Sequence, residues 1–375
     1  MDKILIFFRK IFENQRICAK RTPLTSIMAL AALSTLFGCA KNKGAISISE
    51  QGSFAVGGSI MTEEGKFNPD TLAPDGQTYR GDHAYVFYQI PEGAKKTPMV
   101  FLHGYGQSKK TWESTPDGRD GFQNIFLKRG YKIYLMDQPR RGAAGRSMSA
   151  AEIKPAGDEQ MWFSVFRLGK WPDFYEGSQF PQDKNSLDQF FRQGTPNIGA
   201  ENPNLTANAL SELFDKIGDG ILITHSAGGG PGWHAAMKNP KIKAIAFYEP
   251  GLFVFPEGEV PPPMPSKSPF GELRAEGVPL KDFMKLIKIP IVLYFGDYIP
   301  DEPSNDPGLD NWRVRKQMAK LWVDAINKRG GNATLVDLPK MGIRGNTHFM
   351  FAELNNLRIA ELLEKFIEEK VFSTQ

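Results

Sequence analysis

Short, mainly apolar runs recur along the chain and predict strands that are buried on both faces. A strand inside a parallel sheet needs such runs, because helices pack against both of its faces. The runs occupy residues 98–102, 131–136, 221–223, 242–248, 291–295 and 333–338, and weaker strand signals precede them at 53–56 and 83–90. Segments with helical periodicity alternate with the runs, at residues 122–128, 205–217, 312–328 and 354–368. This alternation predicts an α/β fold with a mostly parallel central sheet flanked by helices.

Two long interruptions break the alternation. Residues 144–205 carry no regular strand pattern, and an irregular stretch of that length inside a compact domain usually forms a lid. Its aromatic side chains either line an apolar substrate pocket or form the lid's own small core, and the sequence leaves both interpretations open. These residues are Trp162, Phe163, Phe166, Trp171, Phe174 and Tyr175, and the first four are the candidate pocket residues. The second interruption, at about 250–288, is rich in proline and ends in a predicted helix at 280–287.

The length and charge balance exclude one broad class of function. With 375 residues, 41% of them apolar, the chain can form one large α/β domain with insertions or two small domains. The formal net charge is +4, but residues 1–38 hold six Lys and Arg against two Asp and Glu. The remainder contains 40 residues of each sign, so we expect no basic patch for nucleic acid.

The first 38 residues have the layout of a secretory signal peptide. Basic residues end at Arg21, and the apolar segment at 27–37 is too short to span a bilayer. It closes on Leu36-Phe37-Gly38-Cys39, which resembles a bacterial lipobox, where the cysteine is lipid-modified and becomes the mature N-terminus. The alternative is an ordinary signal peptide followed by a chance cysteine.

We therefore expect an exported protein that a lipid on Cys39 anchors to a bacterial membrane, at the outer membrane or the cell surface. Without use of the lipobox, the expected location is the periplasm. The expected layout is a signal peptide at 1–38, a linker at 39–50 and one folded domain at 51–375. Because the only other cysteine, Cys18, lies in the leader, the exported domain has no disulfide.

The first candidate for chemistry is a serine between the apolar run at 221–223 and the next helical segment. In Thr224-His225-Ser226-Ala227-Gly228, small residues surround Ser226 at the point where the strand must turn sharply into a helix. This arrangement is typical of a nucleophile elbow, G-x-S-x-G, although Thr224 replaces the first glycine. The alternative is a hydroxyl that merely caps a helix.

A second interpretation of the same region is a dinucleotide-binding loop. Gly230-Pro231-Gly232-Trp233-His234-Ala235 fits G-x-G-x-x-A, and Glu249 stands where an acid for a ribose would be expected. Two features oppose this interpretation. Five residues separate Thr224 from Gly230, and Pro231 removes one of the backbone N–H groups that such a loop must offer.

Two further segments complete a candidate hydrolytic site. A His103-Gly104 loop follows the strand at 98–102, and we expect it to supply one oxyanion-binding N–H, from Tyr105, while Ala227 supplies the other. The alternative is a glycine-rich hairpin with a structural His103. His348 lies on a loop between the last strand and the last helix, where this chain order places a general base. Topology alone favours Asp297, at the end of the strand 291–295, as the acid that orients His348.

With these features together, the chain resembles the α/β-hydrolase-fold serine carboxylesterases, and more narrowly the bacterial esterase 713-like family. The matching stretches are QGSFAVGG from 51, TWESTPDGRDGF from 111, FLKRGY from 126, DQPRRG from 137, YEPG from 248 and GNTHFMFAELNNLRIAELL from 345. The family's typical member has two adjacent cysteines after the His-Gly pair, where this chain has Tyr105 and Gly106. This departure concerns substrate range rather than reaction class.

The resemblance implies a triad of Ser226, His348 and Glu249, with the acid one strand earlier than usual. We expect Glu249 rather than Asp297 to orient His348, since a glutamate has the longer reach and the Pro250-Gly251 turn would hold it at the sheet edge. The expected function is hydrolysis of small-molecule esters through an acyl-enzyme, with no metal or organic cofactor. A lactonase or thioesterase on the same triad, and a non-catalytic surface lipoprotein on the same scaffold, remain alternatives. The sequence does not indicate an oligomeric state.

Overall fold

The computed structural model describes residues 44–372. The chain divides into two compact units, Met1–Ala45 and Ile46–Gln375. The expected signal peptide and the expected lipid-bearing Cys39 lie outside the described residues. Within residues 44–372, no helix combines the length and the apolar character that are needed to cross a membrane.

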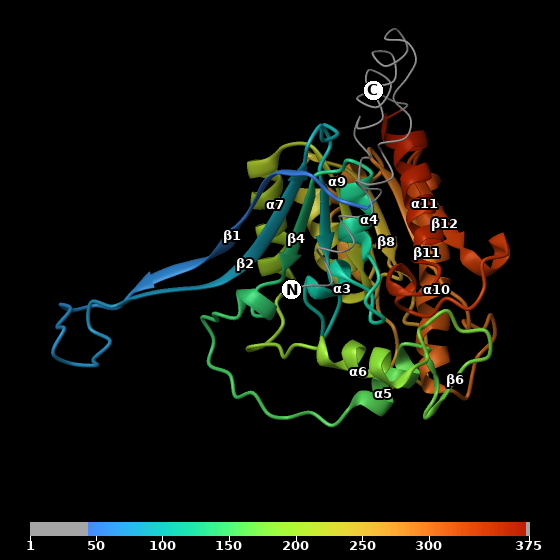
Figure 1. Cartoon of the computed structure of the whole chain (residues 1–375), viewed down its shortest axis with the longest axis horizontal. Helices are drawn as coiled ribbons and strands as arrows, with labels where there is room; N and C mark the ends of the chain where they lie inside the picture. Colours follow the sequence, from blue (N-terminus) through green and yellow to red (C-terminus); the bar gives the residue numbers. More distant parts are fainter. Residues whose placement is uncertain (1–43, 373–375) are drawn as a thin grey trace, which may run out of the picture. The chain divides into compact units, whose positions relative to one another are not determined.

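The second unit is built around an eight-stranded sheet (Figure 1). Its strand order is β1-β2-β4-β3-β7-β8-β11-β12, with antiparallel pairing at β1 and β2 and parallel pairing from β4 to β12. The bounds are β1 Ile48–Thr62, β2 Thr78–Pro91, β3 Met99–Leu102, β4 Ile133–Asp137, β7 Gly220–His225, β8 Ile242–Tyr248, β11 Pro290–Phe295 and β12 Asn332–Asp337. The predicted mostly parallel central sheet is confirmed.

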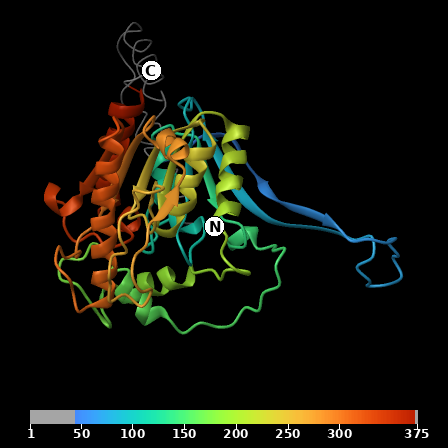
Figure 2. The ribbon, with the colours of Figure 1, turned by 180° about the vertical axis from the view of Figure 1, so that it is seen from behind.

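Helices cover both faces of the sheet, as Figures 1 and 2 show from opposite sides. Side chains along β3 alternate between two hydrophobic cores, since successive residues of a strand point to opposite faces. Val100 and Leu102 join the core of four helices: α7 (Pro203–Ile217), α8 (Gly229–Lys238), α9 (Leu280–Leu286) and α10 (Pro307–Asn327). Met99 and Phe101 join the core of α4 (Phe122–Lys128) and α11 (Asn356–Ile367). Both faces of the parallel strands are therefore dry, which explains their continuous apolar runs.

Shorter elements lie in the connections. The segment expected to form a lid contains α5 (Glu159–Val165), β5 (Gly169–Lys170), β6 (Asp173–Phe174) and α6 (Lys184–Arg192). The proline-rich segment contains β9 (Val254–Pro256), which pairs in parallel with β10 (Glu276–Val278). The remaining elements are α3 (Lys110–Glu113), η1 (Gly142–Ala144), η2 (Ser226–Gly228), η3 (Leu338–Met341), η4 (Met350–Ala352) and η5 (Glu368–Phe372).

Two elements are longer than the hydrophobic pattern predicts. Helix α10 begins at Pro307, five residues before the expected 312, because Asp306 accepts hydrogen bonds from Gly308 and Leu309 and the proline occupies the first turn. Strand β1 begins at Ile48, inside the range 39–50 that was expected to be a linker.

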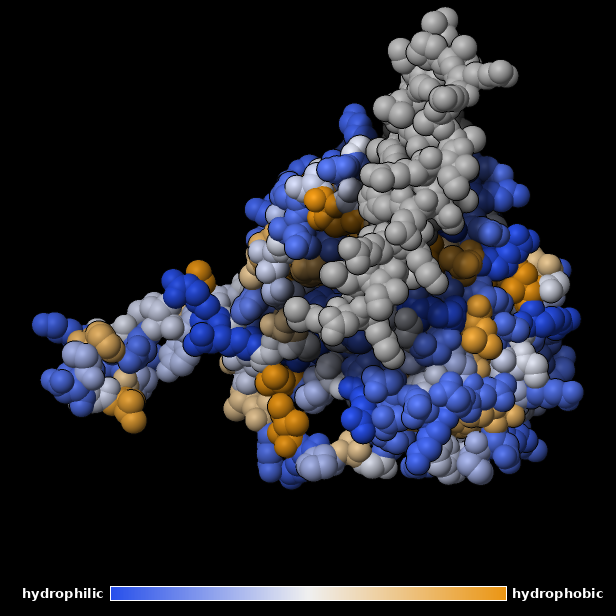
Figure 3. Space-filling view, in the orientation of Figure 1, coloured by the Kyte–Doolittle hydropathy of each residue, from blue (hydrophilic) through white to orange (hydrophobic). Residues whose placement is uncertain are grey.

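Strands β1 and β2 continue past the sheet as a two-stranded arm (Figure 1). The outer residues of β1 and β2 pair only with each other and cover no core. The arm therefore has no continuous apolar face, and the hydrophobic pattern of the sequence does not indicate it. Figure 3 shows hydrophilic and hydrophobic residues mixed at its far end. The large apolar side chains exposed there are Ile60, Met61, Phe67 and Leu72.

Candidate active site

Ser226 lies at a sharp turn between a buried strand and a helix. Strand β7 ends at His225, the short helix η2 begins at Ser226, and α8 follows at once. Ser226 has φ of 54°, a left-handed conformation that costs about 1 kcal/mol or more for a non-glycine residue. Neighbouring backbone holds it in place: the Gly251 N–H donates to the Ser226 carbonyl at 2.9 Å. The strained strand–turn–helix geometry is the one that the sequence pattern indicated.

Thr224 fits the elbow although a glycine is usual at its position. It is fully buried in β7, and its methyl group faces α8. A Cβ added to Gly232 of α8 would lie only 3.1 Å from Thr224 Cγ2. The absence of a side chain at Gly232 therefore makes room for the methyl group. Gly230 and Gly232 lie inside α8 rather than in a loop before it, so they do not form the phosphate-binding turn of a dinucleotide site.

The loop after β3 approaches Ser226 closely. A Cβ added to Gly104 would lie 2.8 Å from Ser226 Cβ, so only a glycine allows this approach. Gly104, Tyr105 and Ala227 line one small cavity of about 60 Å³. Ala227 is the second residue of η2, and the first N–H groups of a helix have no partner within it. The structure thus brings together the two segments whose N–H groups were expected to bind an oxyanion.

His103 is a buried structural residue of the same loop. Its Nε2 accepts a hydrogen bond from the Gln138 backbone N–H at 3.1 Å, and the Gln138 side chain donates to the His103 carbonyl at 2.6 Å. Burial lowers the pKa of His103 to about 4, although nearby Asp137 acts in the opposite direction. His103 is therefore neutral at pH 7 and ties the loop after β3 to the loop after β4.

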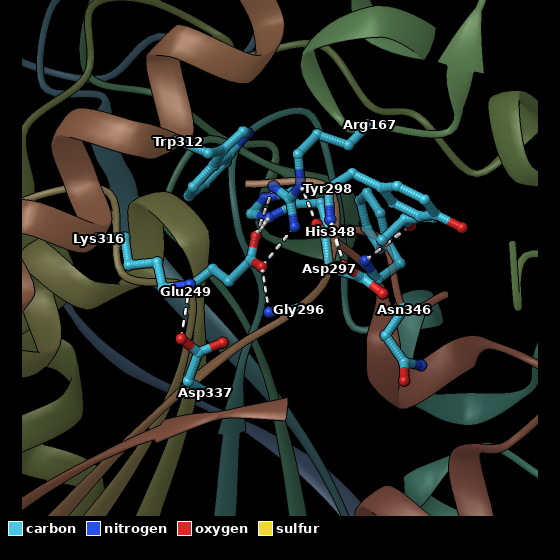
Figure 4. A network of polar contacts seen from close by, with 12 residues as sticks. Arg167, Glu249, Gly296, Asp297, Tyr298, Trp312, Lys316, Asp337, Asn346 and His348 are labelled. Carbon is cyan, nitrogen blue, oxygen red and sulfur yellow. Dashed lines mark hydrogen bonds and ion pairs between the residues drawn. The ribbon is translucent and has the colours of Figure 1, made fainter. Parts of the chain in front are cut away.

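Glu249 and His348 form the polar centre of the site (Figure 4). Glu249 follows β8 directly, has φ of 46° and is fully buried. Its Oε2 lies 2.6 Å from His348 Nδ1, and its Oε1 accepts from the Gly296 N–H at 2.8 Å. Among the described residues, His348 Nε2 is buried without a hydrogen-bond partner. An imidazole held at Nδ1 by a carboxylate, with Nε2 unengaged, is arranged to accept a proton there.

Arg167 completes this centre and was not among the residues predicted from the sequence. Arg167 lies between α5 and β5, is fully buried, and binds Glu249 through both of its terminal nitrogens, at 3.0 Å and 2.5 Å. Its Nε donates to the Asp297 carbonyl at 3.0 Å. The available signal was a charged residue within the apolar stretch 162–168, which is unusual unless the charge is paired.

The charges around Glu249 decide its protonation. Burial alone would raise the pKa of Glu249, but the Arg167 guanidinium and the hydrogen bond with His348 outweigh burial and lower the pKa to about 2. Burial also lowers the pKa of His348 to about 4, with Glu249 acting against this shift and Arg167 adding to it. At pH 7 the pair therefore consists of a carboxylate and a neutral imidazole.

Asp297 lies near Glu249 but engages other partners. One carboxylate oxygen accepts from the Tyr298 N–H at 2.8 Å, and the other accepts from the Gly345 N–H at 2.9 Å. The Asp297 N–H donates to the Asn346 carbonyl at 2.7 Å. Asp297 thus holds the loop that carries His348, and Glu249 is the carboxylate that contacts the imidazole.

Glu353 supports the loop of His348 from behind. It accepts from the Thr347 N–H at 2.8 Å and from the Asn346 side-chain amide at 2.7 Å. Burial raises the pKa of Glu353 to about 7, although these hydrogen bonds lower it. The sequence offered no signal for this role, because a glutamate just before a helix usually lies in solvent.

The expected lid aromatics lie in different surroundings. Trp162 and Phe166 line a cavity of about 570 Å³ together with Tyr105. Phe166 also stacks on the His348 imidazole, with ring centroids 5.4 Å apart. Phe163 is fully buried and belongs to the core that α4 and α11 cover, whereas Trp171, whose ring lies edge-on against it at 5.3 Å, is 46% exposed. Trp162 and Phe166 thus line a cavity and Phe163 lies in a core, while Trp171 does neither.

Comparisons with known proteins agree with this geometry. A family model described as the alpha/beta hydrolase family matches residues 99–339. The probable secreted lipase phiG from Fungal sp. (strain ATCC 74256) is 25% identical over 344 residues, covering 79% of this chain and 88% of that protein. A solved structure described as the atomic resolution structure of a novel bacterial esterase is 31% identical, covers 87% of this chain and 98% of its own, and has a TM-score of 0.68.

Replacing Arg167 is expected to destabilise the protein in a pH-dependent way. Arg167→Met leaves the Glu249 carboxylate buried with less compensation, at a cost of about 3–5 kcal/mol in the free energy of unfolding at pH 7. In the wild type the pKa of Glu249 is lowered, so its contribution is present above about 4.5 and is lost as the pH falls toward 2. In Arg167→Met, burial raises the pKa of Glu249, so the carboxyl takes up a proton as the pH falls. Protonation removes the cost of burying its negative charge. The stability difference should therefore narrow between pH 7 and pH 3 in urea unfolding experiments.

The matched control for this experiment is Arg344→Met. Arg344 also lies beside Asp297, at 3.7 Å, but its side chain is 70% exposed. Its loss should change stability by no more than about 0.5 kcal/mol. A difference for Arg167→Met that does not vary with pH would contradict the assigned ion pair.

Proposed function

Since the chain belongs to the alpha/beta hydrolase family, we propose that it is a serine carboxylesterase that acts through Ser226, His348 and Glu249. One observation carries this proposal: a buried carboxylate bonds His348 Nδ1 and leaves Nε2 without a hydrogen-bond partner among the described residues. Ser226, with positive φ, follows β7, the strand next to the one that Glu249 follows. The similarity to a bacterial esterase at 31% identity, and to a probable secreted lipase, supports ester hydrolysis over other reactions of this family.

The proposed reaction proceeds through an acyl-enzyme. Ser226 Oγ attacks the acyl carbon of the ester while His348 Nε2 takes its proton. The N–H groups of Tyr105 and Ala227 stabilise the oxyanion, and the proton on His348 passes to the leaving alcohol. A water molecule, activated in the same way, then releases the acid. Glu249 stabilises the imidazolium that forms in each half-reaction.

Arg167 has a positioning role in this scheme. It contacts both oxygens of Glu249, so the carboxylate cannot rotate away from His348. It also keeps Glu249 ionised at neutral pH, because it lowers the pKa of the carboxyl. The guanidinium lowers the pKa of His348 as well, which keeps the base neutral before each attack.

We further propose that residues 144–205 act as a lid over a small-molecule ester and that residues 250–288 form a second excursion. The cavity lined by Trp162 and Phe166 would hold the apolar part of the substrate. A lactone or thioester could be cleaved by the same groups, because each presents an acyl carbon to Ser226. A non-catalytic protein on the same scaffold is the alternative from another class.

Labelling of Ser226 separates an enzyme from a non-catalytic scaffold. A fluorophosphonate probe should form a covalent adduct on the folded wild type and none on Ser226→Ala, because only an activated serine reacts with it. Intact-protein mass spectrometry measures the adduct, and thermal melts confirm that both proteins are folded. An adduct that persists in Ser226→Ala, or none on the wild type, would contradict the proposal.

A second pair of variants tests the choice of acid. Glu249→Gln should lower kcat for a p-nitrophenyl ester by about a thousandfold or more, since the imidazolium loses its stabilising charge. Asp297→Asn should stay within about tenfold of wild type, because Asp297 only supports the loop. Thermal melts show whether each variant is folded under the assay conditions. The opposite ranking of the two variants would assign the role to Asp297.

The location of the protein forms a separate proposal. The secreted relative supports export, and we propose that the signal peptide at 1–38 is removed and that Cys39 carries a lipid anchor. Several acyl chains on one cysteine hold a protein firmly at a membrane, whereas a single chain anchors it weakly.

Fractionation of the expressing cells tests the anchor. Cys39→Ser should move the protein from the membrane pellet to the soluble fraction, since the thioether-linked lipid cannot form on serine. Immunoblots of both fractions measure the distribution, with Cys18→Ser as the control that should not change it. A wild-type protein that is already soluble would rule out the lipid anchor and leave an ordinary signal peptide.

A further inference from the structure

Arg141 is a buried cation that lines two cavities, the smaller of which is also lined by Ala227, the residue after Ser226. It follows β4, one residue before η1, and is 3% exposed. Both the 60 Å³ cavity and the 570 Å³ cavity are lined by Arg141 and Tyr105. The Arg141 guanidinium lies over the Tyr105 ring, 4.8 Å from its centroid. The Arg141 guanidinium thus contacts the side chain of Tyr105, the residue whose backbone N–H is proposed to bind the oxyanion.

The pairing of Arg141 differs from that of its neighbour Arg140. Arg140 binds both oxygens of Asp82, at 2.7 Å and 2.8 Å, and donates to the Ala200 carbonyl, so its charge is fully used within the fold. Arg141 has one ion-pair partner among the described residues, a single contact of 2.6 Å from Nη2 to Glu201. The Glu201 side chain is 55% exposed, on the loop before α7.

This single contact leaves most of the donors of Arg141 available. A guanidinium presents five N–H groups and binds a carboxylate best with two of them. None of the Arg141 nitrogens is among the sealed, unpartnered polar atoms of the described residues, so the remaining donors reach the cavities. A buried cation needs an anionic partner, and an exposed glutamate can exchange that position with a ligand at little cost.

We propose that Arg141 binds a negatively charged group of the substrate, so that the preferred ester carries a carboxylate in its acid or its alcohol part. The inference rests on the proposed esterase function and assigns its substrate class. In the bound state the substrate carboxylate replaces Glu201 on the guanidinium, while the ester group reaches Ser226 past Tyr105. The cavity of about 570 Å³ has the size of sites that enclose small organic ligands.

The other charged groups of the larger cavity are less suited to this role. Lys154 lines it too, but its side chain is 73% exposed and faces Glu152 at 3.3 Å. Asp158 is engaged by the Trp162 indole N–H at 2.8 Å, and Glu159 is exposed. Solvent and salt screen such charges, whereas the guanidinium of Arg141 acts in a low-dielectric environment.

Two pairs of esters test the inference. The first pair, 4-acetoxybenzoate and methyl 4-acetoxybenzoate, differs by a carboxylate on the alcohol side. The second pair, the mono-p-nitrophenyl ester of adipic acid and p-nitrophenyl hexanoate, differs by a carboxylate on the acyl side. The readout is the ratio of kcat/KM for the charged ester to that for its neutral partner, and the pair that responds identifies the side.

In at least one pair, Arg141→Gln should lower this ratio by about tenfold or more, mainly through KM, since the charged ester loses its partner. Glu201→Gln, at an exposed position, should raise the same ratio, because it removes the competing carboxylate. Lys154→Gln is the matched control, a cation of the same cavity, and should change the ratio less than about threefold. The opposite responses of the Arg141 and Glu201 variants distinguish specificity from a general loss of structure.

Other results would overturn the inference. An equal loss for charged and neutral esters in Arg141→Gln, or an unchanged ratio in both Arg141→Gln and Glu201→Gln, would reduce Arg141 to a structural residue. If folded wild type cleaves none of the four esters, the esterase proposal fails by itself. The anion site is then judged by calorimetry with 4-hydroxybenzoate and adipate, where binding lost in Arg141→Gln supports it and no binding to wild type rejects it.

Discussion

The arrangement around the candidate site depends on one buried ion pair, between Arg167 and Glu249. Two charges without access to water are costly, and they are tolerated only when each is paired and hydrogen-bonded. Here the carboxylate receives two contacts from the guanidinium, one from the Gly296 N–H and one from His348. The pair joins three parts of the chain that are distant in sequence. They are the segment after α5, the end of β8 and the loop before α11.

The parallel sheet explains why these parts meet. Strands β7, β8 and β11 lie side by side, so the residues that follow their carboxyl ends gather at one edge. Ser226 follows β7, Glu249 follows β8 and Gly296 follows β11. The hydrophobic cores on both faces hold the strands in register, and this packing also fixes the positions of the polar groups at the strand ends. Two of these residues, Ser226 and Glu249, have positive φ, which the packing around them maintains.

Much of this arrangement could be predicted from the sequence because it follows from local pattern. Apolar runs located the parallel strands, and the small residues around Ser226 indicated a strained turn. Arg167 could not be assigned a partner, since an ion pair across 82 positions leaves no periodicity in either segment. The early start of α10 depends on the capping of a single aspartate, and the outer part of β1 is paired only with β2 and lacks a core-facing stripe.

The anchoring of the lid by Arg167 constrains how this protein can diversify. Trp162, on the cavity side, is linked to the site through Phe166, on which its ring stacks with centroids 4.9 Å apart, whereas Arg167 contacts the carboxylate itself. The backbone at Arg167, with φ of 59°, cannot shift without releasing Glu249. A lid taken from a relative that lacks this arginine would bring a new pocket but would leave the buried Glu249 carboxylate without its cationic partner. Recombination between such relatives is therefore productive only when the lid and the glutamate after β8 are inherited together.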